Sequence, residues 1–183
     1  MNDLLKGINV FLIGMMGAGK TTVGGLLASE LGYGFCDTDV LIQQIAGKTI
    51  NEIFAEDGEE TFRQLETQVL SELSAYQQLI VATGGGIVLK PQNWSYLHYG
   101  LVVWLDVPVP MLIERLREDT TRPLLQKPDP ALELQQILDQ RLSLYELADL
   151  HICEDFGETP PQIASRVITE IPKVLKNSKQ KNN

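Results

Sequence analysis

The chain has 183 residues, of which 44% are hydrophobic and 21% are charged, and its formal net charge at pH 7 is -9. This length and composition predict one domain with a sizeable core. An acidic chain repels nucleic acid and anionic membranes, and no basic stripe with interleaved aromatic residues offsets this repulsion. We therefore expect neither nucleic acid nor a membrane as a partner, and no apolar run approaches the ~20 residues of a membrane span.

The N-terminus and the cysteines indicate a cellular compartment. The first expected strand begins near Ile8, which leaves no room for a signal peptide. Cys36 and Cys153 lie far apart and lack the spacing of a metal site or a disulfide framework. We read both as small core residues and expect a cytoplasmic protein that acts as a monomer.

Short apolar strands alternate with helices along the chain. Strands are expected at residues 8–13, 34–36, 79–83, 101–105 and 150–153. Helices are expected at residues 20–31, from 37–39 onward, from the capping-box sequence 49–52, and at 60–76, 111–117, 131–148 and 162–175, the last interrupted or bent near Pro172. This order predicts an α/β fold of three layers, in which helices flank both faces of a five-stranded parallel sheet. Ligands of such sheets bind beyond the carboxyl ends of the strands.

The first strand runs into a sequence that fits G-x-x-x-x-G-K-[ST] at residues 14–21. Backbone N–H groups of such a loop face the phosphates of a nucleoside triphosphate, its lysine reaches the β/γ oxygens, and its hydroxyl holds Mg²⁺. The match lies between an expected strand and an expected helix, as the motif requires. The residues predicted to bind the nucleotide here are Gly17, Ala18, Gly19, Lys20, Thr21 and Thr22, with Thr21 also on the metal.

A P-loop enzyme needs a carboxylate near the metal, and the sequence offers two candidates. Asp106 ends an apolar strand, but a proline-led helix follows it, which favours a helix-capping role. Asp37 and Asp39 are two residues apart, and such a pair repels unless a cation or proton relieves it. We expect one of them to bind Mg²⁺ and the other to accept a proton or a hydrogen bond from an acceptor hydroxyl. The alternative is that one caps a helix and the other is solvated, and one aspartate could also fill both a capping and a functional role.

Two arginines occupy unusual helical positions. Arg141 lies in a stripe that is otherwise apolar: Leu134, Leu138, Arg141, Tyr145 and Ala148. A buried guanidinium needs an anion, so Arg141 meets a ligand, meets an internal carboxylate, or reaches out to solvent. Glu66 takes an inward position with Arg63 three residues before it, which is either a surface ion pair or a carboxylate that orients Arg63 toward a bound anion. Together the arginines suggest a small ligand that carries a carboxylate.

Glycines and a polar loop complete the candidates. Gly84, Gly85 and Gly86 follow the third strand, where they serve either as a flexible turn or as backbone that approaches a ligand. Residues 118–130 form a polar loop with three prolines around Arg122. A mobile arginine could close over the transferring phosphate and exclude water, unless it is simply solvated.

In this order the motifs resemble those of the shikimate kinase family, whose fold is the nucleoside-monophosphate-kinase-like P-loop fold. The resemblance runs from about Val10 to Ala148 and is carried by residues 14–22, Asp37-Thr38-Asp39, Phe62-Arg63 with Glu66, Gly84-Gly85-Gly86, Arg122-Pro123-Leu124-Leu125, and Arg141 with Tyr145. It implies transfer of the γ-phosphoryl group of ATP, with Mg²⁺, to the 3-hydroxyl of shikimate, a step of aromatic amino acid biosynthesis.

The resemblance also implies roles for single residues. Asp37 belongs to the metal, mostly through water, while Lys20 and Arg122 belong to the phosphates and Arg115 to the nucleotide side. Shikimate falls to Asp39, Arg63, Glu66, Gly84, Gly85, Gly86 and Arg141. The residues expected to be catalytic are Lys20, Asp39 and Arg122.

The corresponding domain plan is a single kinase domain over residues 1–183. Its core covers about 8–175, its acceptor-binding region about 38–66, its lid about 117–130, and a frayed tail 176–183. Without the resemblance, the residues predict only a kinase for a small, anionic, hydroxylated acceptor. A kinase for gluconate or for a nucleoside monophosphate, and a nucleotide-binding module that has lost phosphoryl transfer, are the alternatives.

Overall fold

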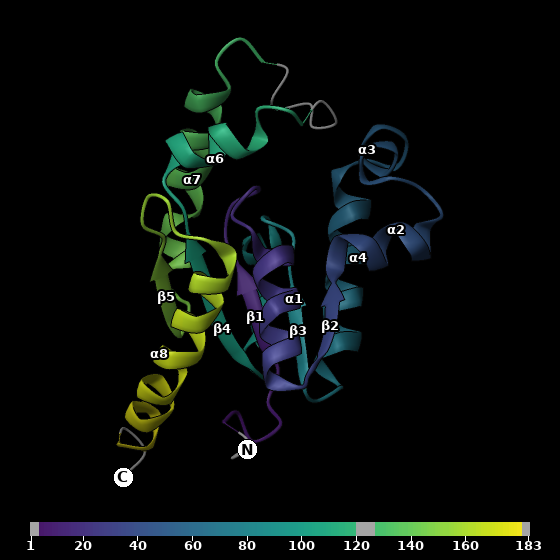
Figure 1. Ribbon diagram of the computed structural model, residues 1–183. Coiled ribbons are helices and arrows are strands. Elements are labelled where there is room, and N and C mark those ends of the chain that lie inside the picture. Colours follow the sequence, from purple (N-terminus) through teal and green to yellow (C-terminus); the bar gives the residue numbers. More distant parts are fainter. Residues whose placement is uncertain (1–3, 120–126, 181–183) are drawn as a thin grey trace.

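The computed structural model describes residues 4–119 and 127–180, with only the backbone of residues 176–180. Its strands are β1 (Val10–Ile13), β2 (Gly34–Asp37), β3 (Leu79–Ala82), β4 (Leu101–Asp106) and β5 (Leu150–Cys153). They form one parallel sheet in the order β2-β3-β1-β4-β5. The predicted five-stranded parallel sheet is confirmed, and its strand carboxyl ends face the upper edge of Figure 1.

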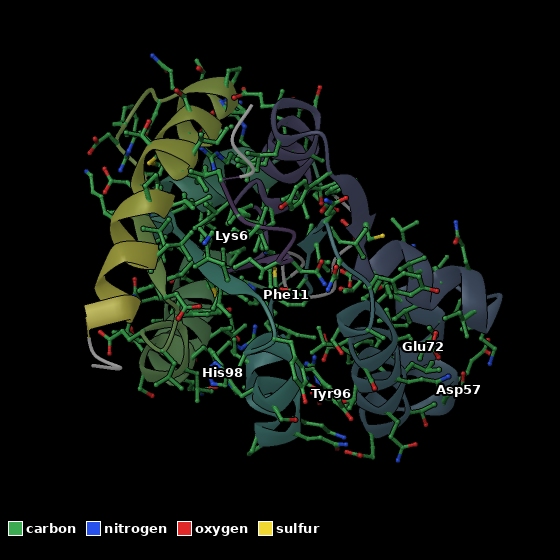
Figure 2. All side chains as sticks on the ribbon, turned by 90° about the horizontal axis from the view of Figure 1, so that it is seen from below. Lys6, Phe11, Asp57, Glu72, Tyr96 and His98 are labelled. Carbon is green, nitrogen blue, oxygen red and sulfur yellow. The ribbon has the colours of Figure 1, made fainter. Side chains whose placement is uncertain are left out.

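Burial explains why β1 is apolar throughout. This strand pairs with β3 on one side and β4 on the other, and all of its residues are buried. The Phe11 ring lies near the centre of the molecule, between two layers of helices, whereas Asp57 and Glu72 lie at the periphery (Figure 2). A central parallel strand has no solvent face, so it carries no polar alternation.

Helices cover both faces of the sheet, as predicted. α1 (Lys20–Leu31) and α8 (Pro160–Gln180) lie on one face, and α4 (Glu59–Ser74), α5 (Pro91–Leu97) and α7 (Pro130–Tyr145) lie on the other (Figure 2). α6 (Val109–Leu116) packs beside α7 near the carboxyl edge (Figure 1). The three-layer α/β architecture is therefore confirmed.

The last helix extends further than expected. The predicted end at residue 175 and the frayed tail from 176 are wrong for residues 176–180, because α8 continues through Pro172 to Gln180. Its inner face buries Ile163, Val167 and Ile171 against the core. This packing holds the helix through a proline that removes one backbone donor.

A cluster of short helices projects beyond the sheet next to α4 (Figure 1). α2 (Thr38–Ala46) leads to α3 (Ile50–Glu52), and the chain then forms η1 (Ile53–Asp57), a π-helical turn. The predicted capping box is confirmed, because Thr49 accepts from the Glu52 N–H and the Glu52 carboxylate accepts from the Thr49 N–H.

Two helical pieces after β3 were not expected. η2 (Ile87–Leu89) and α5 follow the glycines that end this strand.

Within residues 4–119 and 127–180, no helix is both long and apolar enough to cross a membrane.

Candidate active site

The phosphate cradle is the loop between β1 and α1. Gly14 and Gly17 have φ angles of +143° and +77°, which side chains rarely adopt. A Cβ on Gly14 would lie 2.5 Å from the Leu105 carbonyl oxygen, and one on Gly17 would lie 2.9 Å from the Leu116 side chain. Neighbouring elements therefore leave space only for backbone at these two positions of the loop.

Lys20 opens α1 and is only 9% exposed. Its Nζ donates to the Gly14 and Met15 carbonyl oxygens, at 2.8 Å each. This ammonium lies at the N-terminus of a helix, where the helix dipole adds partial positive charge. The loop, the lysine and the helix end together fit a polyphosphate.

A cavity of about 490 Å³ extends from this loop across the carboxyl edge of the sheet. One wall carries Asp37 and Asp39, another carries Gly84 and Gly85, and Arg115 lies near the start of α8. All six predicted loop residues, from Gly17 to Thr22, line this cavity. Met16, Val23, Thr83, Pro160 and Ile163 also line it and were not predicted.

Asp37 faces the cradle from the end of β2. Thr21 Oγ1 donates to Asp37 Oδ2 at 2.7 Å, while Asp37 Oδ1 caps α2 by accepting from the N–H groups of Asp39 and Val40, at 2.9 and 3.3 Å. One hydroxyl and one carboxylate fit Mg²⁺, which takes few protein ligands and completes its octahedron with water and phosphate oxygens. Among the described residues, no cluster of three metal-ligating side chains competes with this pair.

The expectation that Asp106 caps a helix is wrong. α6 has Pro108 at its N-cap and no side-chain cap. Asp106 Oδ2 instead lies 2.8 Å from His151 Nε2, and the His151 ring stacks on Trp104 with centroids 4.1 Å apart. β5 brings His151 beside β4, and this tertiary partner outcompetes the local cap.

The glycine turn (residues 84–86) forms the floor of the other half of the site. A Cβ on Gly84 would lie 2.9 Å from both Asp39 Oδ1 and Glu66 Oε1, and one on Gly85 would lie 3.4 Å from Arg141 Nη1. A Cβ on Gly86 would overlap the Arg63 guanidinium. The turn therefore packs against four of the predicted acceptor residues, which come from α2, α4 and α7.

Arg63 and Glu66 form a buried ion pair rather than a surface one. Arg63 Nη1 lies 2.8 Å from Glu66 Oε2, and the Glu66 side chain is fully buried. Burial raises the pKa of Glu66, an effect that the nearby Arg63 guanidinium opposes. Glu66 Oε1 accepts no hydrogen bond from the described residues. This geometry is the one expected if Glu66 orients the Arg63 guanidinium toward a bound anion.

Arg141 lies on α7, half-buried, and its guanidinium reaches the glycine turn. Arg141 forms no ion pair with a carboxylate in residues 4–119 or 127–180, but the buried Glu66 carboxylate lies close enough for the Arg141 charge to oppose the rise in its pKa. Tyr145, one turn later, donates to the Gly85 carbonyl oxygen at 2.7 Å. An anion that entered between Arg63 and Arg141 would meet both guanidinium groups.

Arg115 lines the same cavity as the phosphate loop. Its guanidinium forms two hydrogen bonds with the carboxylate of Glu154, which is 4% exposed, and a longer one of 3.4 Å with the Gly17 carbonyl oxygen. Glu154 was not predicted, because nothing in its local sequence distinguishes it from a surface glutamate. Arg122, predicted to cover the phosphates, lies outside the described residues.

The fold and this site define a class of protein, a P-loop phosphotransferase that binds a nucleoside triphosphate and a second, anionic ligand at one sheet edge. The sequence model of the shikimate kinase family matches residues 16–172. The shikimate kinase of a Nostoc species is 61% identical over 178 residues, which cover 97% of this chain and 98% of that protein.

Solved structures agree. The shikimate kinase from Acinetobacter baumannii in complex with shikimate superposes with a TM-score of 0.87 at 39% identity, over 95% of this chain and 96% of that one. The shikimate kinase from Bacteroides thetaiotaomicron gives 0.81 at 33% identity, over 92% and 98%. The chain belongs to the shikimate kinase family.

Proposed function

We propose that the protein transfers the γ-phosphoryl group of ATP to the 3-hydroxyl of shikimate and releases ADP and shikimate 3-phosphate. One observation carries this proposal: Arg63 and Arg141 converge on the same glycine turn that Asp39 contacts, beside a phosphate-binding loop. Two guanidinium groups match a carboxylate, and a neighbouring aspartate matches a hydroxyl.

The nucleotide half binds and orients ATP. Amides of residues 17–22 and the Lys20 ammonium hold the β- and γ-phosphates, and Arg115 and Pro160 lie where the nucleoside would extend. Thr21 and Asp37 would hold Mg²⁺, Asp37 mostly through water. When bound, Mg²⁺ neutralises charge on the phosphate oxygens.

The acceptor half places the alcohol in line with the phosphate. Arg63, held by Glu66, and Arg141 bind the carboxylate of shikimate, and the Gly84, Gly85 and Gly86 backbone shapes the floor. Asp39 accepts the proton of the 3-hydroxyl while the hydroxyl oxygen of shikimate forms a bond to the γ-phosphorus. The bond between the γ-phosphorus and the β-γ bridging oxygen breaks at the same time, and ADP leaves. Lys20 stabilises the charge that develops on the phosphates.

The domain plan remains part of the proposal. We assign acceptor binding to residues 38–66 and a covering lid to residues 117–130, where Arg122 would meet the phosphates and exclude water. We also propose that the protein acts as a monomer. The reading of both cysteines as core residues is wrong for Cys153, which is exposed at the end of β5, and Cys36 is only partly buried. Both thiols are free, which fits the reducing cytoplasm.

The test follows ADP release with ATP and Mg²⁺, with and without shikimate, and identifies the phosphate ester by ³¹P NMR. We expect ADP and ester in equal amounts with shikimate and only slow hydrolysis without it. Gluconate and AMP should not replace shikimate. The methyl ester of shikimate should be a poor acceptor, because it lacks the charge that the arginines bind. An ADP rate that ignores shikimate would refute the proposal.

A further inference from the structure

The glycine turn is tied to the rest of the molecule by two side-chain hydroxyl groups. The Gly84 N–H donates to Thr38 Oγ1 at 3.1 Å, and Tyr145 Oη donates to the Gly85 carbonyl oxygen at 2.7 Å. Thr38 and Tyr145 are both 0% exposed. The proposed function uses the groups around the turn but gives neither hydroxyl a role.

A run of three glycines needs such ties. Glycine loses more backbone freedom on folding than any other residue, so the turn has a strong entropic tendency to move. It must nevertheless stay close to Asp39, Arg63 and Arg141, because a site loosened by about 1 Å binds and reacts poorly. The Gly84 and Gly86 carbonyl oxygens accept from the Ile87 and Leu89 N–H groups of the next turn. No side chain within residues 84–86 can restrain the turn, so any restraint on its Gly84 N–H and Gly85 carbonyl groups has to come from other elements.

Thr38 provides the tie to the acceptor carboxylate. It lies between Asp37 and Asp39 at the start of α2, where Asp37 fixes the helix end. Through its hydroxyl, the turn keeps a set distance from the residue proposed to bind the 3-hydroxyl. A valine at this position would keep the shape and lose only the acceptor oxygen.

Tyr145 provides the tie to the carboxylate-binding arginine. It lies one helical turn after Arg141 on α7, and its ring stacks on Trp104 of β4 with centroids 5.7 Å apart. Its hydroxyl also lies 3.7 Å from Met15 Sδ in the phosphate loop. Burial raises the pKa of Tyr145, so the hydroxyl keeps the proton that it donates to Gly85.

We propose that Thr38 and Tyr145 are positioning residues that clamp the glycine turn and thereby set the distance between the Asp39 carboxylate and the Arg63–Arg141 pair. This proposal rests on the proposed function for its catalytic readout. The clamp itself is a property of the free protein. It predicts a selective loss of acceptor binding when either hydroxyl is removed.

The variants are Thr38→Val and Tyr145→Phe, with Thr38→Ser as the rescue and Tyr33→Phe as the matched control. Tyr33 Oη also bonds a backbone group, the Gly7 N–H at 3.2 Å, but at the opposite edge of the sheet. One lost hydrogen bond should raise the KM for shikimate by about three- to tenfold, with the KM for ATP within about twofold. Thr38→Ser and Tyr33→Phe should stay within about twofold of the wild type on both.

Hydrogen–deuterium exchange of the ligand-free proteins gives a readout that needs no substrate. The amides of residues 84–86 should exchange at least about threefold faster in Thr38→Val and Tyr145→Phe, while Thr38→Ser and Tyr33→Phe should not change. A lower melting temperature with unchanged KM for shikimate, or an equal rise in both KM values, would overturn the clamp. If the wild type fails to phosphorylate shikimate, only the proposed function is refuted. The clamp is then decided by exchange alone, and unchanged exchange of residues 84–86 in Thr38→Val and Tyr145→Phe would refute it.

Discussion

The two halves of the site are built from different parts of the chain, one mainly from a loop and the other from side chains of several helices. The phosphate loop of the nucleotide half is one continuous segment, residues 14–22, of which residues 16–22 line the cavity, Lys20 and Thr21 among them. The acceptor half is assembled from side chains of α2, α4 and α7 around the glycine turn. Only the sheet brings these distant segments together.

This difference separates general from specific recognition. Backbone amides bind phosphate, which all nucleoside triphosphates share, so the loop sets the class of reaction. Side chains at fixed separations read one acceptor, so α2, α4 and α7 set its identity. Mutations in the two halves should therefore have separable kinetic effects.

The largest effect is expected at Lys20. Lys20→Met should lower kcat by about 100- to 1,000-fold, because a preorganised charge on the phosphates is lost at the transition state. The binding of shikimate in the absence of nucleotide should barely change. Steady-state kinetics and calorimetric titration check both points, and a variant that loses shikimate affinity as well would argue against separate halves.

Arg141→Ala should act on the opposite half. Removing one partner of a buried charge pair costs about 2–5 kcal/mol, so affinity for shikimate should fall by that amount. ATP affinity should stay within about twofold, because no described residue of α7 lines the cavity beside the phosphate loop. Isothermal titration with each ligand provides the measurement.

Lys173→Ala is the control for the loss of one cation, because Lys173 pairs with Glu170 on the surface of α8. It should change neither affinity. Equal losses of both ligands in Arg141→Ala would mean that this arginine supports the fold and does not meet the acceptor.

A smaller effect is expected at Glu154, which belongs to the nucleotide half without touching the phosphate loop. Its buried carboxylate fixes the Arg115 guanidinium beside the cavity. Glu154→Gln should weaken ADP binding by about threefold to tenfold and leave the KM for shikimate unchanged. If Glu154 acts only through Arg115, the double variant with Arg115→Ala should bind ADP no worse than Arg115→Ala alone. Additive losses would show an independent role.

The same contrast decides what the sequence could predict. The loop of residues 14–22, the five strands and the Asp37–Asp39 pair are local patterns, so periodicity and spacing suffice to find them. The inward position of Glu66 on its helix is also a local pattern, but it left open whether the ion pair with Arg63 lies at the surface or is buried. These features need no knowledge of which strands are neighbours.

Other features depend on contacts between distant segments. Asp106 carries a local capping pattern, but His151, 45 residues later, takes its carboxylate. The hydroxyl of Thr38 meets Gly84, and Glu154 meets Arg115, only after the strands have paired. Neither Thr38 nor Glu154 differs in its neighbourhood from a helix start or a surface residue, so spacing alone could not find them.

The smallest effect concerns stability and comes from the buried Glu66. Burial raises its pKa above the ordinary value of 4.5, so the folded protein binds this proton more tightly than the unfolded chain. The free energy of unfolding that Glu66 contributes is therefore highest below pH 4.5 and falls as pH rises through the folded pKa. Glu66→Gln cannot ionise and should lack this loss, so its stability relative to the wild type should rise as the pH is raised from 4.5 to neutrality.

Urea unfolding across that pH range checks the sign. Glu72→Gln, at an exposed position of the same helix (Figure 2), isolates the effect of burial. A wild type that gains stability over Glu66→Gln with rising pH would mean that Arg63 outweighs burial at Glu66. Attraction between charged side chains would then hold the acceptor half together. We infer instead that packing around the glycine turn holds Glu66 and the two arginines in place in the absence of substrate.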